Sequence, residues 1–249
     1  MTRHTGRVES ATANGGGAAR PLGSAGCLHC HTTRVVQVRI LFIGNSFTAR
    51  NNLPALLARL ANDRGRIVEH RLISAGGASL RQHLNGPTAL AAIAEGTYDI
   101  VVLQEQSTLP GRNAPRMHDS VRDFYAAIEQ AGARTALYMT WARRNAPEAQ
   151  QAITTAYATI AAELGATLVP VGMVWDRFLS AHDRPILHDA DDSHPALAGS
   201  YLAACVFLVS LLGEHPVDID VPVKGLDIDT AALLRQAAWD ICEDIALGR

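Results

Sequence analysis

The sequence predicts an α/β fold, namely a flavodoxin-like three-layer α/β/α sandwich around a five-stranded parallel sheet. Short runs rich in Val, Ile and Leu alternate with longer segments in which apolar residues recur every three or four positions. The short runs are almost continuously apolar, which is typical of parallel strands covered by helices on both faces. At 249 residues the chain is long enough to bury the core of one such domain.

The elements follow from these patterns in chain order. The predicted strands lie at 38–43, 67–73, 99–103, 135–140 and 167–171. The predicted helices lie at 53–64, 87–95, 115–130, 147–164, directly after His194, and at 227–247. Gly132 and Gly165 follow the third and fourth helices, where a glycine suits the C-terminal cap. Alternating strands and helices imply parallel strands joined by right-handed crossovers.

One predicted helix could also span a membrane. The segment at 195–213, "PALAGSYLAACVFLVSLLG", carries no charge and is almost long enough to cross a bilayer. It contains Gly199, Ser200, Tyr201 and Ser210, and it stands alone near the end of the chain. A helix covered on all sides by protein is also apolar all round, so we predict a buried helix.

Residues 1–34 differ in composition from the rest of the chain. The stretch "ESATANGGGAARPLGSAG" has no apolar periodicity and cannot bury enough surface to offset the entropy cost of ordering. We therefore predict a disordered leader at 1–34 and one folded domain at 35–249. The leader shows no charged segment followed by an apolar run, so no export signal is expected and the cytoplasm is the default location.

The leader also contains the C-x-x-C-H pattern Cys27-Leu28-His29-Cys30-His31, which is typical of haem attachment. Haem attachment needs export and a folded pocket, neither of which this composition offers. A zinc site would need a second ligand pair, which is missing. We expect the pattern to be a coincidence, and we keep a haem or zinc protein built on the leader as a further hypothesis.

The overall charge and the remaining cysteines exclude several other classes. A net charge of −2 gives no electrostatic reason to expect nucleic acid or an anionic membrane as a partner. Four cysteines are too few and too scattered for a disulfide framework. Cys205 and Cys242 lie in apolar helical patterns, so we expect them to be buried thiols.

Polar residues follow the predicted strands at their carboxyl ends, where ligands bind in open α/β sheets. Gly44-Asn45-Ser46 follows the first strand, "SAGGAS" (74–79) the second and Gln104-Glu105-Gln106-Ser107 the third. The fourth strand is followed by Trp141-Ala142-Arg143-Arg144. These last residues have two possible roles. They bind an acyl group or an anionic substrate, or they form an amphipathic rim of the site whose charges are solvated.

A serine nucleophile needs a base, a carboxylate that orients the base, and donors for the oxyanion. Ser46 is the candidate nucleophile and His194 the candidate base. Asp191, three residues before His194, can reach its own histidine within a short loop, whereas Asp189 and Asp192 are competitors. Alternatively, Ser46 is a turn serine or part of a helix N-terminus.

The region 38–213 resembles the SGNH (GDSL-like) hydrolase superfamily on three motifs: Gly44-Asn45-Ser46, the glycine turn in "SAGGAS", and Asp191-x-x-His194-Pro195. This resemblance implies a flavodoxin-like hydrolase fold and ester hydrolysis through an acyl-enzyme. It implies Ser46 as nucleophile, with Asp191 and His194 as acid and base. It also implies an oxyanion N–H from Gly76, with Gly77 as the alternative.

Two positions depart from the superfamily pattern. Where that pattern has Gly-x-Asn-Asp, this chain has "VVLQEQS", so Gln106 falls on the oxyanion asparagine and Gln104 on the glycine. A glutamine carries the same amide on a longer arm. Asn45 replaces the aspartate beside the nucleophile. Gln104 and Gln106 have two possible roles: they contact the oxyanion or substrate, or they satisfy backbone groups at the sheet edge. We expect Glu105 to point away from the site and to bind the next helix.

We therefore expect a serine ester hydrolase, either a short-chain esterase or a carbohydrate O-deacetylase. The expected partner is a small-molecule or carbohydrate ester, and neither metal nor cofactor is required. A lipase or thioesterase of the same fold is the alternative enzyme. A catalytically silent carbohydrate-binding domain is the alternative of another class.

Overall fold

The computed structural model describes residues 36–249 and contains one five-stranded sheet in the order β2-β1-β3-β4-β5. Every neighbouring pair of strands is parallel. This order is that of flavodoxin-like folds and confirms the predicted fold class. The leader and its C-x-x-C-H pattern lie outside the described residues. The strands are β1 (Val36–Gly44), β2 (Arg66–Ser74), β3 (Ile100–Leu103), β4 (Arg134–Tyr138) and β5 (Thr167–Val169).

Strand β1 lies where the chain order reverses, between β2 and β3. Its register with β3 runs from Ile40 opposite Ile100 to Ile43 opposite Leu103. The carboxyl ends of β1 and β3 therefore finish side by side. In open α/β sheets the crevice at this switch point is the usual binding site.

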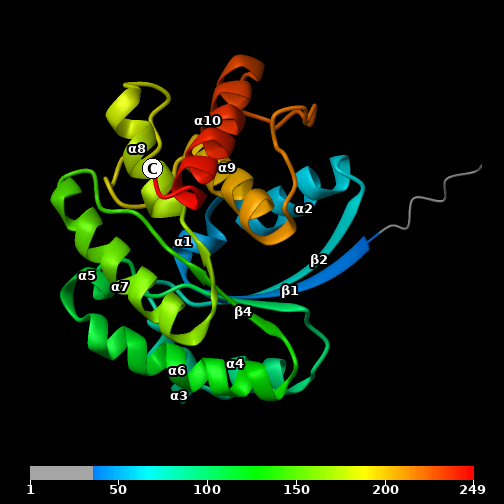
Figure 1. Cartoon of the computed structure of the whole chain (residues 1–249), viewed down its shortest axis with the longest axis vertical. Coiled ribbons are helices and arrows are strands. Elements are labelled where there is room, and N and C mark those ends of the chain that lie inside the picture. The colour runs from blue at the N-terminus through cyan, green and yellow to red at the C-terminus, as the bar shows by residue number, and fades with distance from the viewer. Residues whose placement is uncertain (1–35) are drawn as a thin grey trace, which may run out of the picture. The chain divides into compact units, whose positions relative to one another are not determined.

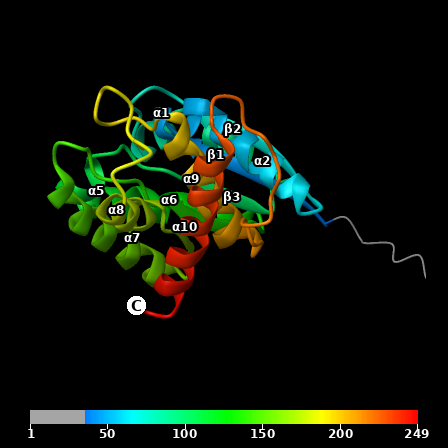
Figure 2. The same ribbon diagram turned by 90° about the horizontal axis from the view of Figure 1, so that it is seen from above.

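Helices cover both faces of the sheet, as Figure 1 shows. Above the sheet in that view lie α1 (Ser46–Ala49), α2 (Leu53–Asp63), α8 (Val171–Ala181), α9 (Leu197–Phe207) and α10 (Ile228–Ala246). Below it lie α3 (Leu80–Asn85), α4 (Pro87–Ala94), α5 (Leu109–Arg112), α6 (Ala114–Gln130) and α7 (Gln150–Leu164). Helix α10 packs on α9, and Figure 2 shows this pair from above.

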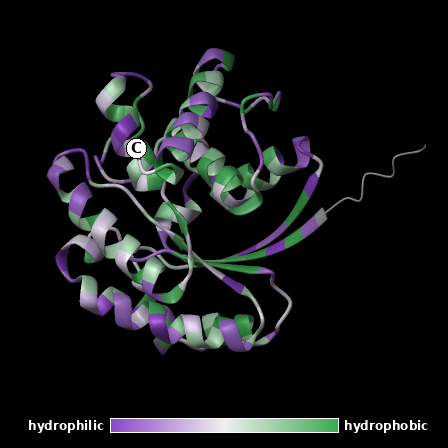
Figure 3. Ribbon diagram, in the orientation of Figure 1, coloured by the Kyte–Doolittle hydropathy of each residue, from purple (hydrophilic) through white to green (hydrophobic). Residues whose placement is uncertain are grey.

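Side chains alternate between two apolar cores along the central strands. Ile40 and Phe42 of β1 belong to the core under α2, α8, α9 and α10, whereas Leu41 and Ile43 belong to the core under α4, α6 and α7. Figure 3 shows the hydrophobic colouring of these strands. Burial on both faces explains why the runs read as continuously apolar.

Strand β2 departs from this expectation because it is an edge strand. Val68 is its buried residue, and the Ile67 side chain is 44% exposed. The near-continuous apolar pattern predicted burial on both faces, which is wrong for β2. An edge strand lacks a neighbour on one side, so polar residues such as Arg66 and Glu69 fit there.

The uncharged segment after His194 forms α9, which is buried along its length from Ala198 to Phe207. Gly199 lies where a Cβ atom would be 2.3 Å from the Trp175 ring and 2.4 Å from the Leu187 carbonyl oxygen. A larger side chain there would displace both neighbours. Within residues 36–249, no helix has the length and apolar character needed to cross a bilayer.

Helices α1, α3, α5 and α8 add to the elements expected from the sequence. Helix α8 begins at Val171, a residue that was predicted to end a strand. Val171, Val174, Trp175 and Phe178 are buried on one face of α8. Their spacing is helical and was the available signal, but the adjoining apolar strand obscured the boundary.

Candidate active site

The turn after β1 presents Ser46 at the first position of α1. Asn45 caps this helix, because its Oδ1 accepts from Phe47 N at 3.0 Å. Asn45 Nδ2 donates to Ala78 O at 2.9 Å, which joins the turn to the loop after β2. Asn45 is almost fully buried and also lines the pocket in front of Ser46. Its contacts therefore orient the serine and the glycine loop together.

Gln104 supports the same turn from behind. Its Oε1 accepts from Asn45 N at 2.9 Å and from Thr48 Oγ1 at 3.0 Å, and its Nε2 donates to Glu105 O. A Cβ atom on Gly44 would lie 2.6 Å from Gln104 Oε1, so the glycine makes room for this contact. Gln104 is fully buried and does not line the pocket. Its contacts are those expected if the side chain satisfies backbone groups at the end of the strand.

The predicted triad residues lie in hydrogen-bonding contact. Ser46 Oγ is 2.8 Å from His194 Nε2, and His194 Nδ1 is 2.5 Å from Asp191 Oδ2. Asp191 Oδ1 also accepts from the backbone N–H of Ser193 and of His194, at 3.0 and 2.8 Å. These three contacts, one from the His194 ring and two from backbone N–H groups, hold the Asp191 carboxylate and the His194 imidazole in a fixed orientation within one loop. This arrangement matches the order of contacts in a nucleophile–base–acid triad.

The carboxylate that faces His194 is held in its charged form. The hydrogen bond from the His194 ring, followed by that from the His194 backbone, lowers the pKa of Asp191 below its usual range. The competing carboxylates are turned elsewhere: Asp189 pairs with Arg50 at 2.7 Å, and Asp192 lies 3.7 Å from Arg144. The geometry therefore favours Asp191 over Asp189 and Asp192.

Aromatic rings support the imidazole. Phe47 lies 5.3 Å from the His194 ring and 5.0 Å from Trp141, and Trp141 stacks on Trp175 at 3.7 Å. Trp141 Nε1 donates to Ser193 O at 3.1 Å. Trp141 is buried, so it belongs to this support and not to an exposed rim. Phe47 and Trp175 were not singled out from the sequence, because an aromatic residue in an apolar helix gives no signal beyond core packing.

Backbone donors line the other side of the pocket. Among residues 36–249, the N–H groups of Ser46, Gly76 and Gly77 have no protein acceptor. All three residues line the pocket in front of Ser46. Unpaired donors next to a nucleophile are what an oxyanion hole requires. Both Gly76 and Gly77 remain suitable as the second backbone donor.

Gln106 also lines this pocket. Its Oε1 accepts from Thr108 N at 2.9 Å and from Leu109 N at 3.0 Å, so the amide oxygen faces the start of α5. The Nε2 group is then left as the donor of this side chain. Glu105 does not line the pocket, and its Oε1 accepts from Leu80 N at 3.0 Å and Gln106 N at 2.6 Å. Leu80 begins α3, which precedes β3 in the chain, so the expected contact with the next helix is wrong.

Comparison with solved structures places the chain in a known family. A protein from Slackia heliotrinireducens assigned to the SGNH hydrolases is 33% identical, with a TM-score of 0.62 over 70% of this chain and 99% of that one. The chain belongs to the SGNH hydrolase family. A DUF4886 family protein from Bacteroides uniformis shares the fold at 18% identity, with a TM-score of 0.67 over 83% of this chain and 95% of that one. The acetyl xylan esterase AlAXEase shares it at 12% identity, with a TM-score of 0.57 over 70% of this chain and all of that one.

No protein-family model and no curated sequence matches the chain. Membership of the SGNH hydrolases therefore rests on structure and on the Slackia sequence, and it supports a hydrolase function. The departures of this chain from the family pattern lie at Asn45, Gln104 and Gln106. The first two of these side chains are engaged in fixing the serine turn.

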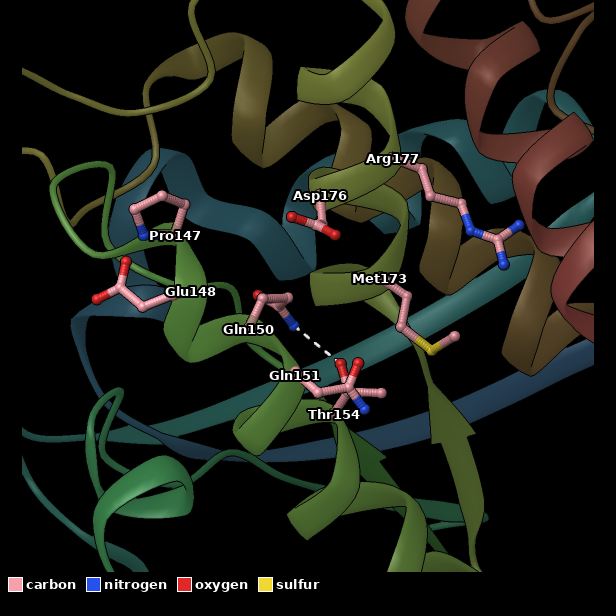
Figure 4. A pocket seen from close by; sticks show the side chains of 8 residues that line it. All are labelled: Pro147, Glu148, Gln150, Gln151, Thr154, Met173, Asp176 and Arg177. Atoms are coloured by element: carbon pink, nitrogen blue, oxygen red, sulfur yellow. Dashed lines mark hydrogen bonds between the residues drawn. The ribbon is translucent and has the colours of Figure 1, made fainter.

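The active-site pocket in front of Ser46 is an open cavity of about 380 Å³. A hollow of about 340 Å³ between α7 and α8 contains none of the triad residues (Figure 4). In the part of the chain from 36 to 249, no group of three His, Cys, Asp or Glu residues is arranged to hold a metal ion. Residues that line the active-site pocket are Asn45, Ser46, Phe47, Gly76, Gly77, Gln106, Ser107, Arg143, Ser193 and His194.

Proposed function

We propose that this protein is a serine ester hydrolase that acts on short-chain or carbohydrate O-acyl esters through an acyl-enzyme. The contact of Ser46 Oγ with His194 Nε2, backed by Asp191, carries this proposal. His194 is within range to take the proton of Ser46 as the hydroxyl attacks the ester carbonyl. Asp191 keeps Nδ1 as a donor and stabilises the imidazolium that forms.

The oxyanion of the tetrahedral intermediate would lie against the N–H groups of Ser46 and Gly76 and the Gln106 amide. His194 then protonates the leaving alcohol, and the bond between the carbonyl carbon and that oxygen breaks. Water, deprotonated by His194, attacks the acyl-enzyme and releases the carboxylic acid and free Ser46. Gly77 supplies an alternative backbone donor on the same wall.

Hydrolysis of 4-nitrophenyl acetate, butyrate and octanoate, with a fluorophosphonate probe in parallel, tests the proposal. We expect activity and labelling to disappear together in Ser46→Ala, with a fall in kcat of about 10⁶ toward the residual rate typical of disabled triads. A preference for acetate and butyrate would support a short-chain substrate, whereas a preference for octanoate would favour the lipase or thioesterase alternative. Unchanged activity in Ser46→Ala would remove this triad from the mechanism.

Asp191 offers a matched pair of variants. Asp191→Asn should lower kcat by about 10³–10⁴, because the amide holds the wrong histidine tautomer. Asp192→Asn removes the same charge one residue away and should change kcat/KM little. Equal losses in both variants would contradict the assignment of Asp191. Wild-type protein that binds acetylated oligosaccharides but neither hydrolyses esters nor reacts with the probe would favour the silent carbohydrate-binding alternative.

A further inference from the structure

A second, more apolar pocket adjoins the catalytic pocket. The two share Ser107 and Arg143 as lining residues, and the second encloses about 200 Å³. That volume is about that of seven water molecules at ~30 Å³ each, so it suits a short chain of similar heavy-atom count. Its walls consist mainly of small side chains: Gly111, Ala142, Ala146, Ala149, Ala152 and Ile153.

The charges around this apolar pocket have one sign. Arg112 and Arg143 both line it and both are exposed, and no Asp or Glu lines it or the catalytic pocket among residues 36–249. Within that range neither arginine forms an ion pair, unlike the neighbouring Arg144, which faces Asp192. Two uncompensated guanidinium groups beside an apolar pocket favour an anionic ligand with an apolar body.

The loop that carries Arg143 is held at several points. Ala142 N donates to Gln150 Oε1 at 2.7 Å, and Ala142 O is 3.0 Å from His188 Nε2. Ala146 N donates to Arg143 O at 3.0 Å. Gln150 is itself fixed, because its Nε2 donates to Thr154 Oγ1 (Figure 4). The backbone around Arg143 is thus positioned before a ligand arrives, which reduces the entropy cost of binding.

The position of His194 indicates which part of an ester enters this pocket. The leaving alcohol oxygen must lie near His194 Nε2 to receive a proton. His194 lines the catalytic pocket and does not line the apolar pocket. The leaving group therefore stays beside His194, and the acyl chain is the part that can extend past Ser107.

We propose that the preferred acyl group is a short aliphatic chain that ends in a carboxylate, as in a monoester of a dicarboxylic acid. The chain lies in the apolar pocket and the terminal carboxylate pairs with Arg143, assisted by Arg112. This inference rests on the proposed esterase function and names its acyl specificity. The reaction products would be the alcohol and the free dicarboxylic acid.

Three 4-nitrophenyl esters of matched chain length test the proposal: the monoester of adipic acid, its methyl-capped neutral form, and the hexanoate. Wild type should show a higher kcat/KM for the adipate monoester than for either neutral ester, by about twofold to fivefold for an exposed charged contact. Arg143→Gln should abolish this preference, so that kcat/KM for the adipate monoester falls to the level of the two neutral esters in the same variant. Arg134→Gln, which removes one exposed charge at the amino-terminal end of β4, should keep the preference.

Ala149→Leu tests the contribution of the apolar pocket separately from that of the Arg143 charge. The larger side chain should fill the apolar pocket and lower the rate on hexanoate relative to acetate, whereas Arg143→Gln should leave that ratio unchanged. If hexanoate is hydrolysed by Ser46 without any preference for the adipate monoester, the acyl specificity is wrong and the esterase function stands.

Binding to Ser46→Ala tests the pocket independently of turnover. Calorimetric titration with methyl hydrogen adipate and with dimethyl adipate should show tighter binding of the anion, and loss of that difference in the Ser46→Ala, Arg143→Gln double variant. Equal affinity of the two esters for Ser46→Ala would overturn the proposal, whatever the activity of the wild type.

Discussion

At the residue scale, the Gln106 amide contacts the start of α5 through its oxygen and, in the proposed mechanism, would serve a second task by donating to the oxyanion through its nitrogen. Its oxygen accepts from Thr108 N and Leu109 N, so the nitrogen is the donor that remains on a residue that lines the pocket. The backbone donors thus determine the orientation of the amide. An asparagine arm is shorter than this glutamine by one methylene group, so the longer arm allows both contacts from one position.

Gln106→Glu separates these two tasks. The remaining carbonyl-type oxygen can still accept from the start of α5, whereas the nitrogen donor is lost and a negative charge faces the pocket. We expect kcat to fall by about 10²–10³, the usual effect of losing one oxyanion donor, with little change in melting temperature. Steady-state kinetics on 4-nitrophenyl acetate and thermal denaturation measure the two effects.

Gln151→Glu, which makes the same chemical change at an exposed position on α7, is the control and should keep wild-type activity. An active Gln106→Glu protein would show that the backbone N–H groups are sufficient for the oxyanion. A large drop in melting temperature would instead mean that the contact with α5 had been lost.

The contacts among Ser46, His194 and Asp191 were predictable, whereas the contacts of the two glutamines were not. Asp191 and His194 are close in sequence, so a short loop is sufficient to bring their side chains together. Gln104 and Gln106 are two residues apart in a segment where β3 has just ended, so strand alternation no longer determines which way each side chain points. Only the contacts of Gln104 with Asn45 and Thr48 assign it to the support of the turn.

At the element scale, Glu105 joins the end of β3 to the start of α3. Its Oε1 accepts from Leu80 N and from Gln106 N, and it is fully buried. Among the described residues, Glu105 Oε2 has no hydrogen-bond partner. Burial is the main cause that raises the pKa of this carboxyl above its usual range.

This shift predicts a pH-dependent stability. The folded protein holds the Glu105 proton to a higher pH than the unfolded chain does, so the free energy of unfolding falls as pH rises from about 4.3 through the raised folded pKa. Glu105→Gln keeps an acceptor for both N–H groups and does not titrate. Its stability relative to wild type should therefore increase between pH 4 and pH 7, as measured by urea denaturation at each pH.

Glu163→Gln provides a control of opposite sign. The hydrogen bond from Arg122 lowers the pKa of Glu163, so its contribution to stability is present above the unfolded pKa and is lost in acid. The Glu163→Gln variant should lose stability relative to wild type as pH rises, by a small amount because the pair is exposed. A Glu105→Gln protein whose relative stability does not change with pH would contradict the raised pKa.

The long elements were predictable because their patterns are regular over many residues. Helix α6 shows buried residues at helical spacing from Met117 to Ile128, and it lies where the sequence placed a helix. Helix α3 has only six residues, which is too short for an apolar period to be recognised. Its start depends on a capping box between Ser79 and Gln82 that no hydrophobic pattern reveals.

At the scale of the whole molecule, the strand order explains why residues from distant parts of the sequence meet. Strands β2 and β3 lie on opposite sides of β1 and run parallel to it. The segments that follow the three strands therefore meet at the carboxyl-terminal end of the sheet. The loop with Asp191 and His194 reaches this end from α9, whose burial anchors it. The sequence predicted that the segments after these strands lie together, because the carboxyl ends of parallel strands are on the same side of the sheet.

Deletion of residues 1–34 tests the predicted division of the chain. The described fold begins with Val36 opposite Arg66, and Val35–Arg249 form one compact unit, so the shortened protein retains the whole of β1. We expect its free energy of unfolding and its kcat/KM on 4-nitrophenyl acetate to equal those of the full chain. The full chain should show no Soret band and no stoichiometric zinc, because the C-x-x-C-H pattern lies in a stretch whose composition does not support a folded pocket. A Soret band or bound zinc that disappears on deletion would instead identify the leader as a cofactor site, and a loss of stability would extend the domain into it.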